Sequence, residues 1–306
     1  MYARSVVLVF LGACSYGVLS TFVKLAYADG YDTGHVTGSQ MLFGMLMLWA
    51  LAWPFRRQWV RLSWREVMKI AAAGSLVGIT GIFYYASLRY IPASIAIVLL
   101  FQFTWIGVLL EALTTRKAPP AMKGVSVAVL LAGTVLASGL LEGNLDRLPL
   151  LGLGLGFLSA VSYALFIYLS GRVAPTVSPW LRSPIMITGS FVATLLVYPP
   201  VFLVDGSLAE RLALWGFLLA LFGAVLPTLF FTYGVPHIGP GLASILGSAE
   251  LPTAVLMSRF VLGEAVSLWQ WLGVALILFG IGVAELKPPR WLRTRSPMPA
   301  SGRDRK

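Results

Sequence analysis

The carboxylate of Glu250 lies near the middle of a long apolar stretch of this sequence. Placing an ionised carboxylate at the centre of a membrane costs on the order of 3 kcal/mol. The group would therefore take up a proton or pair with a substrate ammonium group, unless it is a protonated acid that hydrogen-bonds a neighbouring helix and serves the fold. Pro252 follows two residues on, and Pro227 lies in the preceding apolar stretch. Each can break a helix and turn carbonyl groups toward a cavity, or kink the helix for packing alone.

Other polar side chains interrupt the apolar stretches. Gln102 can donate and accept hydrogen bonds, and Trp105 offers a flat wall to a side chain or a cation, although membrane aromatics more often pack against lipid and helices. Lys24 ends the first stretch, from which its long side chain can reach the interface. Two Ser-Tyr pairs could line a shared cavity, although small hydroxyls also join membrane helices; they are Ser15 with Tyr16, and Ser162 with Tyr163.

Helices are needed to position these residues. Of the 306 residues, 58% are hydrophobic and 11% are charged, which excludes an ordinary soluble domain. A helix needs about 20 apolar residues to cross a membrane. The sequence predicts an all-α membrane protein with ten transmembrane helices. The first could be read as a signal peptide, but its length and polar residues favour a span. The spans are placed near 5–27, 34–54, 67–88, 92–114, 121–141, 149–171, 180–204, 211–234, 239–262 and 267–286.

The basic residues set the orientation, because cytoplasmic flanks retain lysine and arginine. With the N-terminus inside, 18 of the 23 basic residues fall on the cytoplasmic side and 4 on the outer side, so both termini are predicted to be cytoplasmic. The net charge of +11 then follows from topology and does not indicate nucleic-acid binding, which needs a basic face on a soluble domain. The lone Cys14 with His35 and His237 predicts no disulfide and no metal site, and no cofactor is expected.

The two halves of the chain share short matches in the same order, about 150 residues apart, which predicts an internal repeat. Five spans per repeat is an odd number, so the second copy would enter the membrane from the opposite side. The repeat places Gln102 opposite Glu250. The matches are Ala13, Ser15 and Tyr16 with Ala160, Ser162 and Tyr163; Thr37-Gly38-Ser39 with Thr188-Gly189-Ser190; Tyr85 and Pro92 with Tyr233 and Pro240; and Gly124 and Gly133 with Gly273 and Gly282.

Three stretches carry a family resemblance: Ser15-Tyr16-Gly17 through Lys24, the run from Tyr85 to Tyr90 before Pro92, and the segment from Ser248 to Ile281. From residue 1 to about 286 the chain resembles the drug/metabolite transporter superfamily of EamA type, which includes bacterial amino-acid and metabolite exporters. The second span of the family often carries an arginine where this chain has Gln40. A charge-based site on that helix is therefore not expected.

The resemblance implies two EamA repeats, at residues 1–141 and 149–286, around a central cavity in a bacterial inner membrane. A basic, proline-rich cytoplasmic tail at 287–306 is expected to be disordered. Lys24 and Tyr85 match family positions and join the candidate substrate-binding residues. The expected function is secondary transport of small solutes, with export of amino acids or related metabolites and proton coupling as the finer hypothesis.

Drug efflux is a further alternative among transporters. The rival from another class is a membrane scaffold or an intramembrane enzyme. An enzyme would need a recognisable nucleophile, a carboxylate pair or a metal cluster, whereas Glu250 is the one acidic residue placed deep in a span. No nucleotide-binding loop of Walker type is present, which argues against direct coupling of transport to ATP.

Overall fold

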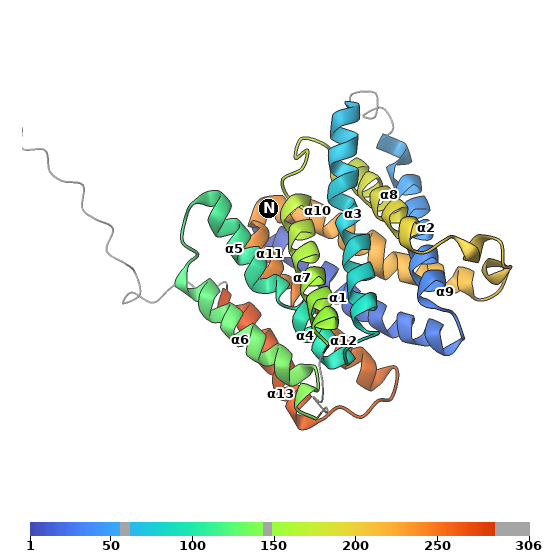
Figure 1. Ribbon diagram of the computed structural model, residues 1–306. Coiled ribbons are helices and arrows are strands. Elements are labelled where there is room, and N and C mark those ends of the chain that lie inside the picture. The colour runs from blue at the N-terminus through green and yellow to red at the C-terminus, as the bar shows by residue number, and fades with distance from the viewer. Residues whose placement is uncertain (56–61, 143–148, 285–306) are drawn as a thin grey trace, which may run out of the picture.

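The computed structural model describes residues 1–55, 62–142 and 149–284, and this part of the chain consists of helices joined by loops (Figure 1). Eight helical segments are long and apolar enough to cross a membrane, which confirms a multi-pass membrane protein. They are Tyr2–Ala28 (α1), Thr33–Phe55 (with α2, Thr33–Ala52), Trp64–Ser87 (α3), Ala93–Thr115, Leu150–Ser170 (α7), Pro179–Val197 (α8), Leu212–Ile238 and Pro240–Phe260.

Two further apolar helices are shorter than a typical span. These are α6 (Ala121–Ala137) and α13 (Leu268–Ala284), which fall on the fifth and tenth predicted spans. Each has 17 residues, so each is about 25 Å long at 1.5 Å per residue. They pack against each other along one side of the molecule (Figure 1). The count of ten spans stays a prediction. The predicted tail at 287–306 lies outside the described residues.

Two of the spans are broken near their middle. The fourth consists of α4 (Ala93–Leu100) and α5 (Phe103–Thr115), and the ninth of α11 (Pro240–Gly247) and α12 (Glu250–Phe260). Each break leaves two residues between its half-helices, and the two breaks occupy matching positions in the two halves of the sequence. Pro252 lies in the first turn of α12, where a residue without an N–H group is tolerated. The break therefore comes before Pro252.

The eighth span is irregular in another way. It runs from α9 (Leu212–Ala220) through a π-helical segment (Leu221–Val225) into α10 (Leu226–Ile238). Pro227 is at the second position of α10, directly after the wide turn. A proline there removes a backbone donor from the preceding turn, and short π-helical segments are frequent at functional sites.

The helices of the two halves interleave (Figure 1). In chain order, α1, α2 and α3 of the first half correspond to α7, α8 and the span of α9 and α10 in the second. Helix α3 packs on α7 and α8, and in the same way α10 packs on α1 and α9 packs on α2. Likewise, α1 packs on α12, and α7 packs on α4 and α5. Each contact thus has a counterpart in which the corresponding helices of the two halves exchange roles. The space between the halves is therefore enclosed by helices of both.

Glycine allows the closest of these crossings. A Cβ atom at Gly74 of α3 would overlap the backbone of Met186 in α8, and one at Gly189 of α8 would overlap the backbone of Ala71. Ser190 then donates a 2.7 Å hydrogen bond to the carbonyl oxygen of Gly74. Without a hydrophobic driving force between helices in lipid, such close backbone packing and interhelical bonds hold membrane helices together.

Candidate functional site

A cavity of about 320 Å³ lies between the helices, within the range of small-molecule sites. It reaches the surface at Lys24 and Tyr27, whose side chains are exposed. Most of its wall comes from the C-terminal halves of α1 and α3, the N-terminal half of α2, and α4 and α12. The lining residues with polar side chains are Tyr16, Ser20, Lys24, Tyr27, Thr37, Gln40, Thr80, Tyr84, Tyr85, Tyr163 and Glu250.

Glu250 is the carboxylic acid of this cavity. It begins α12 at the break of the ninth span, and its side chain makes no hydrogen bond or ion pair with any other described residue. Tyr16, Tyr84 and Tyr163 lie within electrostatic range of it. The rings of Tyr16 and Tyr163 pack edge to face with centroids 5.9 Å apart, and both hydroxyl groups are buried without a hydrogen-bond partner. An unpaired acid and unpaired phenols are groups that a polar ligand can satisfy.

At the mouth of the cavity, Lys24 is already paired. Its Nζ atom lies 2.9 Å from both carboxylate oxygens of Glu264, which lies in the loop between α12 and α13. Ser258 also donates to this carboxylate, and together with Lys24 it lowers the pKa of Glu264. The ion pair therefore links α1 to the α12–α13 loop beside the opening.

Two further polar links join the halves at the same end of the molecule. Asp29 accepts a 2.9 Å hydrogen bond from the indole of Trp215 and lies 3.5 Å from Arg211. The imidazole of His35 bridges Asp32, at 2.8 Å, and Asp205, at 2.6 Å. Hydrogen bonds from Ser207 and then from His35 lower the pKa of Asp205 to about 2. These bonds hold the C-terminal end of α1 and the N-terminal end of α2 to α9 and to the loop that precedes it.

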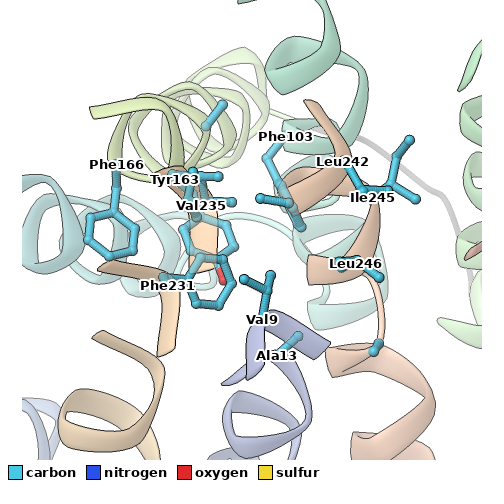
Figure 2. Close-up of a cluster of buried hydrophobic side chains, with 14 of the residues drawn as sticks. Val9, Ala13, Phe103, Tyr163, Phe166, Phe231, Val235, Leu242, Ile245 and Leu246 are labelled. Carbon is cyan, nitrogen blue, oxygen red and sulfur yellow. The ribbon is translucent and has the colours of Figure 1, made fainter. Parts of the chain in front are cut away.

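A cluster of buried hydrophobic side chains adjoins the cavity at Tyr163, which belongs to both (Figure 2). Phe103, Phe166 and Phe231 are fully buried there with Tyr163, and the rings of Phe103 and Tyr163 are 4.6 Å apart. Val9, Val235 and residues of α11 complete the cluster (Figure 2). At this closed end α5 packs directly against α11. The cavity is thus accessible from one end of the bundle and closed toward the other.

Arg182 is a further buried residue, with 1% of its surface exposed. It lies near the start of α8, which begins at Pro179, and it is one of the basic residues that the sequence assigns to the cytoplasmic side, which stays a prediction. Its guanidinium donates to the carbonyl oxygens of Val173 and Thr232, so its charge faces the carbonyl groups near the end of α7 and in α10. Carbonyl groups at a helix C-terminus carry partial negative charge, and they offset part of the cost of burying a cation.

Five of the residues predicted from sequence line the cavity: Tyr16, Lys24, Tyr85, Tyr163 and Glu250. The two predicted serines are not among its lining residues and join helices instead. Ser15 donates a 2.7 Å hydrogen bond to the carbonyl oxygen of Phe222 in the π-helical segment, and Ser162 donates at 2.9 Å to that of Leu76 in α3. The substrate roles of all these residues stay predictions.

Gln102 and Trp105 do not line the cavity in this conformation. The amide of Gln102 donates to the carbonyl oxygen of Val98 at 2.9 Å, and its oxygen accepts a 2.9 Å hydrogen bond from the Trp105 indole. These bonds bridge the break between α4 and α5. The pair thus stabilises the broken helix here, and its predicted contact with substrate stays a prediction.

Sequence reasoning missed several wall residues, including Thr37, Gln40 and Tyr84. Helical periodicity could have found some of them. Residues 16, 20, 24 and 27 lie on one face of α1, so Tyr16 and Lys24 together imply Ser20 and Tyr27. Gln40 is 6% exposed, and its amide makes no hydrogen bond with other described residues. The resemblance gives no reason to expect a site at this position, where the family often has an arginine, yet Gln40 lines the wall near Gly223.

Interleaved helices of membrane-spanning length around a cavity with one open end form the architecture of a membrane transporter. The model of the EamA-like transporter family matches residues 3–139 and 150–285, and the chain belongs to this family. An uncharacterized transporter of Archaeoglobus fulgidus is 29% identical over 90% of this chain and 94% of its own length. One of Synechocystis sp. is 22% identical over 90% and 91%. A protein of known crystal structure shares the fold, with a TM-score of 0.78, 18% identity and coverage of 93% of this chain and 97% of its own.

Proposed function

We propose that this transporter is a secondary transporter that exports amino acids or related small amine-bearing metabolites across the bacterial inner membrane. The observation that carries the proposal is the position of Glu250, an unpaired acid at the deep end of a cavity that lies between the two halves of the chain. Acidic residues inside membrane proteins typically mark substrate or ion pathways. The family shows that the chain is a transporter, and the cavity supports a small solute as its cargo.

Proton coupling follows from the chemistry of this acid. An empty cavity favours the neutral acid, because an isolated carboxylate is poorly solvated there. An incoming ammonium group favours the carboxylate instead. Proton and ammonium therefore compete for Glu250: an amine that enters from the cytoplasm releases the proton to that side, and a proton that enters through the outer mouth releases the amine to the outside. Exchange of one for the other would drive export against a concentration gradient.

Alternating access is supported by the exchanged helix contacts of the two halves. The closed end contains the contact between α5 and α11, and the corresponding half-helices at the other end are α4 and α12. Ile97 and Leu100 of α4 and Leu251 and Ala254 of α12 line the open cavity. In the opposite conformation we expect α4 to pack on α12 while α5 separates from α11. This exchange is the usual behaviour of inverted repeats, and we assign the repeats to residues 1–141 and 149–286.

The test is counterflow in liposomes reconstituted with the purified protein, screened with amino acids, amines and neutral metabolites. The matched variant is Glu250→Gln, which keeps the size of the neutral acid but cannot ionise. We expect wild-type protein to accelerate exchange of at least one amine-bearing solute and the variant to lose pH-dependent, concentrative transport. Absence of counterflow with every solute would favour the non-transporting scaffold. Wild-type pH dependence in the variant would leave Glu250 as a structural residue.

A further inference from the structure

The charges around the cavity restrict the class of solute that it can hold. Among its described lining residues, the acidic or basic side chains, which can carry a full charge, are those of Lys24 and Glu250. They occupy opposite parts of the site, since Lys24 is at the exposed mouth and Glu250 is at the deep end between α1 and α12. A zwitterionic amino acid would need a free cation for its carboxylate and a free anion for its ammonium group.

The cation is not free. Both oxygens of Glu264 lie 2.9 Å from the Lys24 Nζ atom, and Ser258 also donates to the same carboxylate, so the pair is geometrically well formed. A substrate carboxylate would have to compete with Glu264 for this lysine. Deeper in the cavity it would lose hydration without gaining an opposite charge, and it would approach the carboxylate of Glu250.

The acid, in contrast, is free, and tyrosine rings line the same cavity. Glu250 has no hydrogen-bond or ion-pair partner within the described part of the chain, and Tyr16, Tyr84 and Tyr163 line the same cavity. A carboxylate attracts an ammonium group directly, and a tyrosine ring attracts a cation through its electron-rich face. The remaining polar wall is neutral. Thr37 has a buried hydroxyl without a partner, and Gln40 offers an unpaired amide. Such groups suit hydroxyl, amide or ester functions.

We infer that the cavity selects organic amines whose remaining body is uncharged, such as arylalkylamines, amino alcohols and amino-acid amides or esters, over zwitterionic amino acids. The inference rests on the proposed transport function and narrows its substrate class. The ammonium group binds Glu250 among the tyrosine rings, and the neutral end of the solute lies against Thr37 and Gln40.

Pairs of probes that differ only in the carboxylate test this inference on the purified full-length protein. Tyramine, tyrosine methyl ester and tyrosine form one set, and phenethylamine with phenylalanine forms another. We expect the amines and the ester to bind at least tenfold more tightly than the free amino acids, equivalent to about 1.4 kcal/mol. Equal or tighter binding of the amino acids would overturn the inference.

Two variants assign the cause. In Glu250→Gln the amines should lose their advantage, because the anion that holds them is gone. In Glu264→Gln, Lys24 becomes available to a substrate carboxylate, and the preference for amines should narrow as binding of the amino acids improves. An unchanged preference in either variant would contradict the role given to that residue.

Counterflow separates this inference from the proposed function. Exchange of amino acids without exchange of amines would refute the substrate class and leave the transporter assignment standing. Exchange of amines in preference to amino acids would support both. Exchange of neither set, together with no binding, would refute the inference, and the transport proposal would then depend on the remaining solutes of the screen.

Discussion

The contact between α5 and α11 gives a direct way to perturb the closed end. Gly107 of α5 faces Ser244 of α11, and a Cβ atom at Gly107 would lie 2.6 Å from the Cβ of Ser244 and closer still to its Oγ. Carbon atoms at their best separation are about 3.5–4.0 Å apart, so Gly107→Ala must push the helices apart by about 1 Å. Overpacking of this kind costs about 1–3 kcal/mol.

That cost applies only while α5 and α11 touch. If transport requires them to separate, the substitution raises the population of the conformation in which the closed end is open. A change of 1–3 kcal/mol corresponds to a shift of about 5- to 150-fold. Gly107→Ala therefore favours opening of the closed end, whereas a variant that only weakens binding at the open mouth does not.

The assay measures how often the closed end opens. Val235 belongs to the hydrophobic seal and is 1% exposed. A Val235→Cys probe in a cysteine-free background reacts with a thiol reagent only during opening, so its labelling rate follows the open population. We expect Gly107→Ala to raise this rate by about 5- to 150-fold.

Two controls distinguish opening from general unfolding. Ser244→Gly removes the clashing atoms, so the double variant with Gly107→Ala should return to the slow rate. Gly124→Ala is a matched substitution on α6 at a position where no atom lies within 4 Å of the new Cβ, and it should leave the rate unchanged. No acceleration in Gly107→Ala, or acceleration that Ser244→Gly does not reverse, would refute the α5–α11 gate.

Three further predictions concern other parts of the structure. Gly17→Val should impair substrate binding more than it lowers expression, because a side chain there would overlap the carbonyl of Glu250 and displace the start of α12, as ligand titration of the purified variant would show. The pKa of Asp205 is lowered, so its carboxylate stabilises the fold above about pH 4, the ordinary value, and this contribution is lost as pH falls toward about 2. The melting temperature of Asp205→Asn should thus be lower than that of wild type near pH 7 and approach it near pH 2. In intact cells, an impermeant thiol reagent should label a cysteine at Asp205 and spare one at Arg116; the reverse pattern would invert the topology.

The length and apolar character of the spans could be predicted from sequence because lipid imposes both. The break in the fourth span could not, and for the ninth span Pro252 indicated that a break was possible but not that it comes before the proline. Residues 93–115 and 240–260 each form one apolar run, and Pro227 marks a possible irregularity of the eighth span without predicting a π-helical segment. A helix loses a backbone hydrogen bond where a group on a neighbouring helix can bond the freed carbonyl oxygen instead. The Ser15 hydroxyl does so for the carbonyl oxygen of Phe222.

The site could be predicted in part for a related reason. Tyr16 and Glu250 are polar groups in apolar surroundings, so residue type alone selects them. The direction of a side chain around its helix is a different question, since neighbouring positions differ by about 100°. Ser15 and Tyr16 are adjacent, yet Ser15 bonds a neighbouring helix and Tyr16 lines the cavity. Arg182 shows a different limit, because its residue type does not predict its burial, which depends on the carbonyl groups of the folded neighbours.

The broken spans show how the two halves divide their tasks. The second half-helix of the fourth span begins at Phe103 and that of the ninth at Glu250, so the structure matches Glu250 with Phe103, one residue beyond Gln102. Phe103 packs against Gly247 and seals the closed end, whereas Glu250 faces the cavity. If α4 and α12 close over the cavity in the other conformation, Glu250 meets Leu100, the counterpart of Gly247. An ionised, unpaired carboxylate cannot pack against that leucine at low cost, whereas a protonated acid or an acid paired with an ammonium group can. Closure is thereby conditional on a bound proton or a bound amine, and this condition is what exchange of one for the other requires.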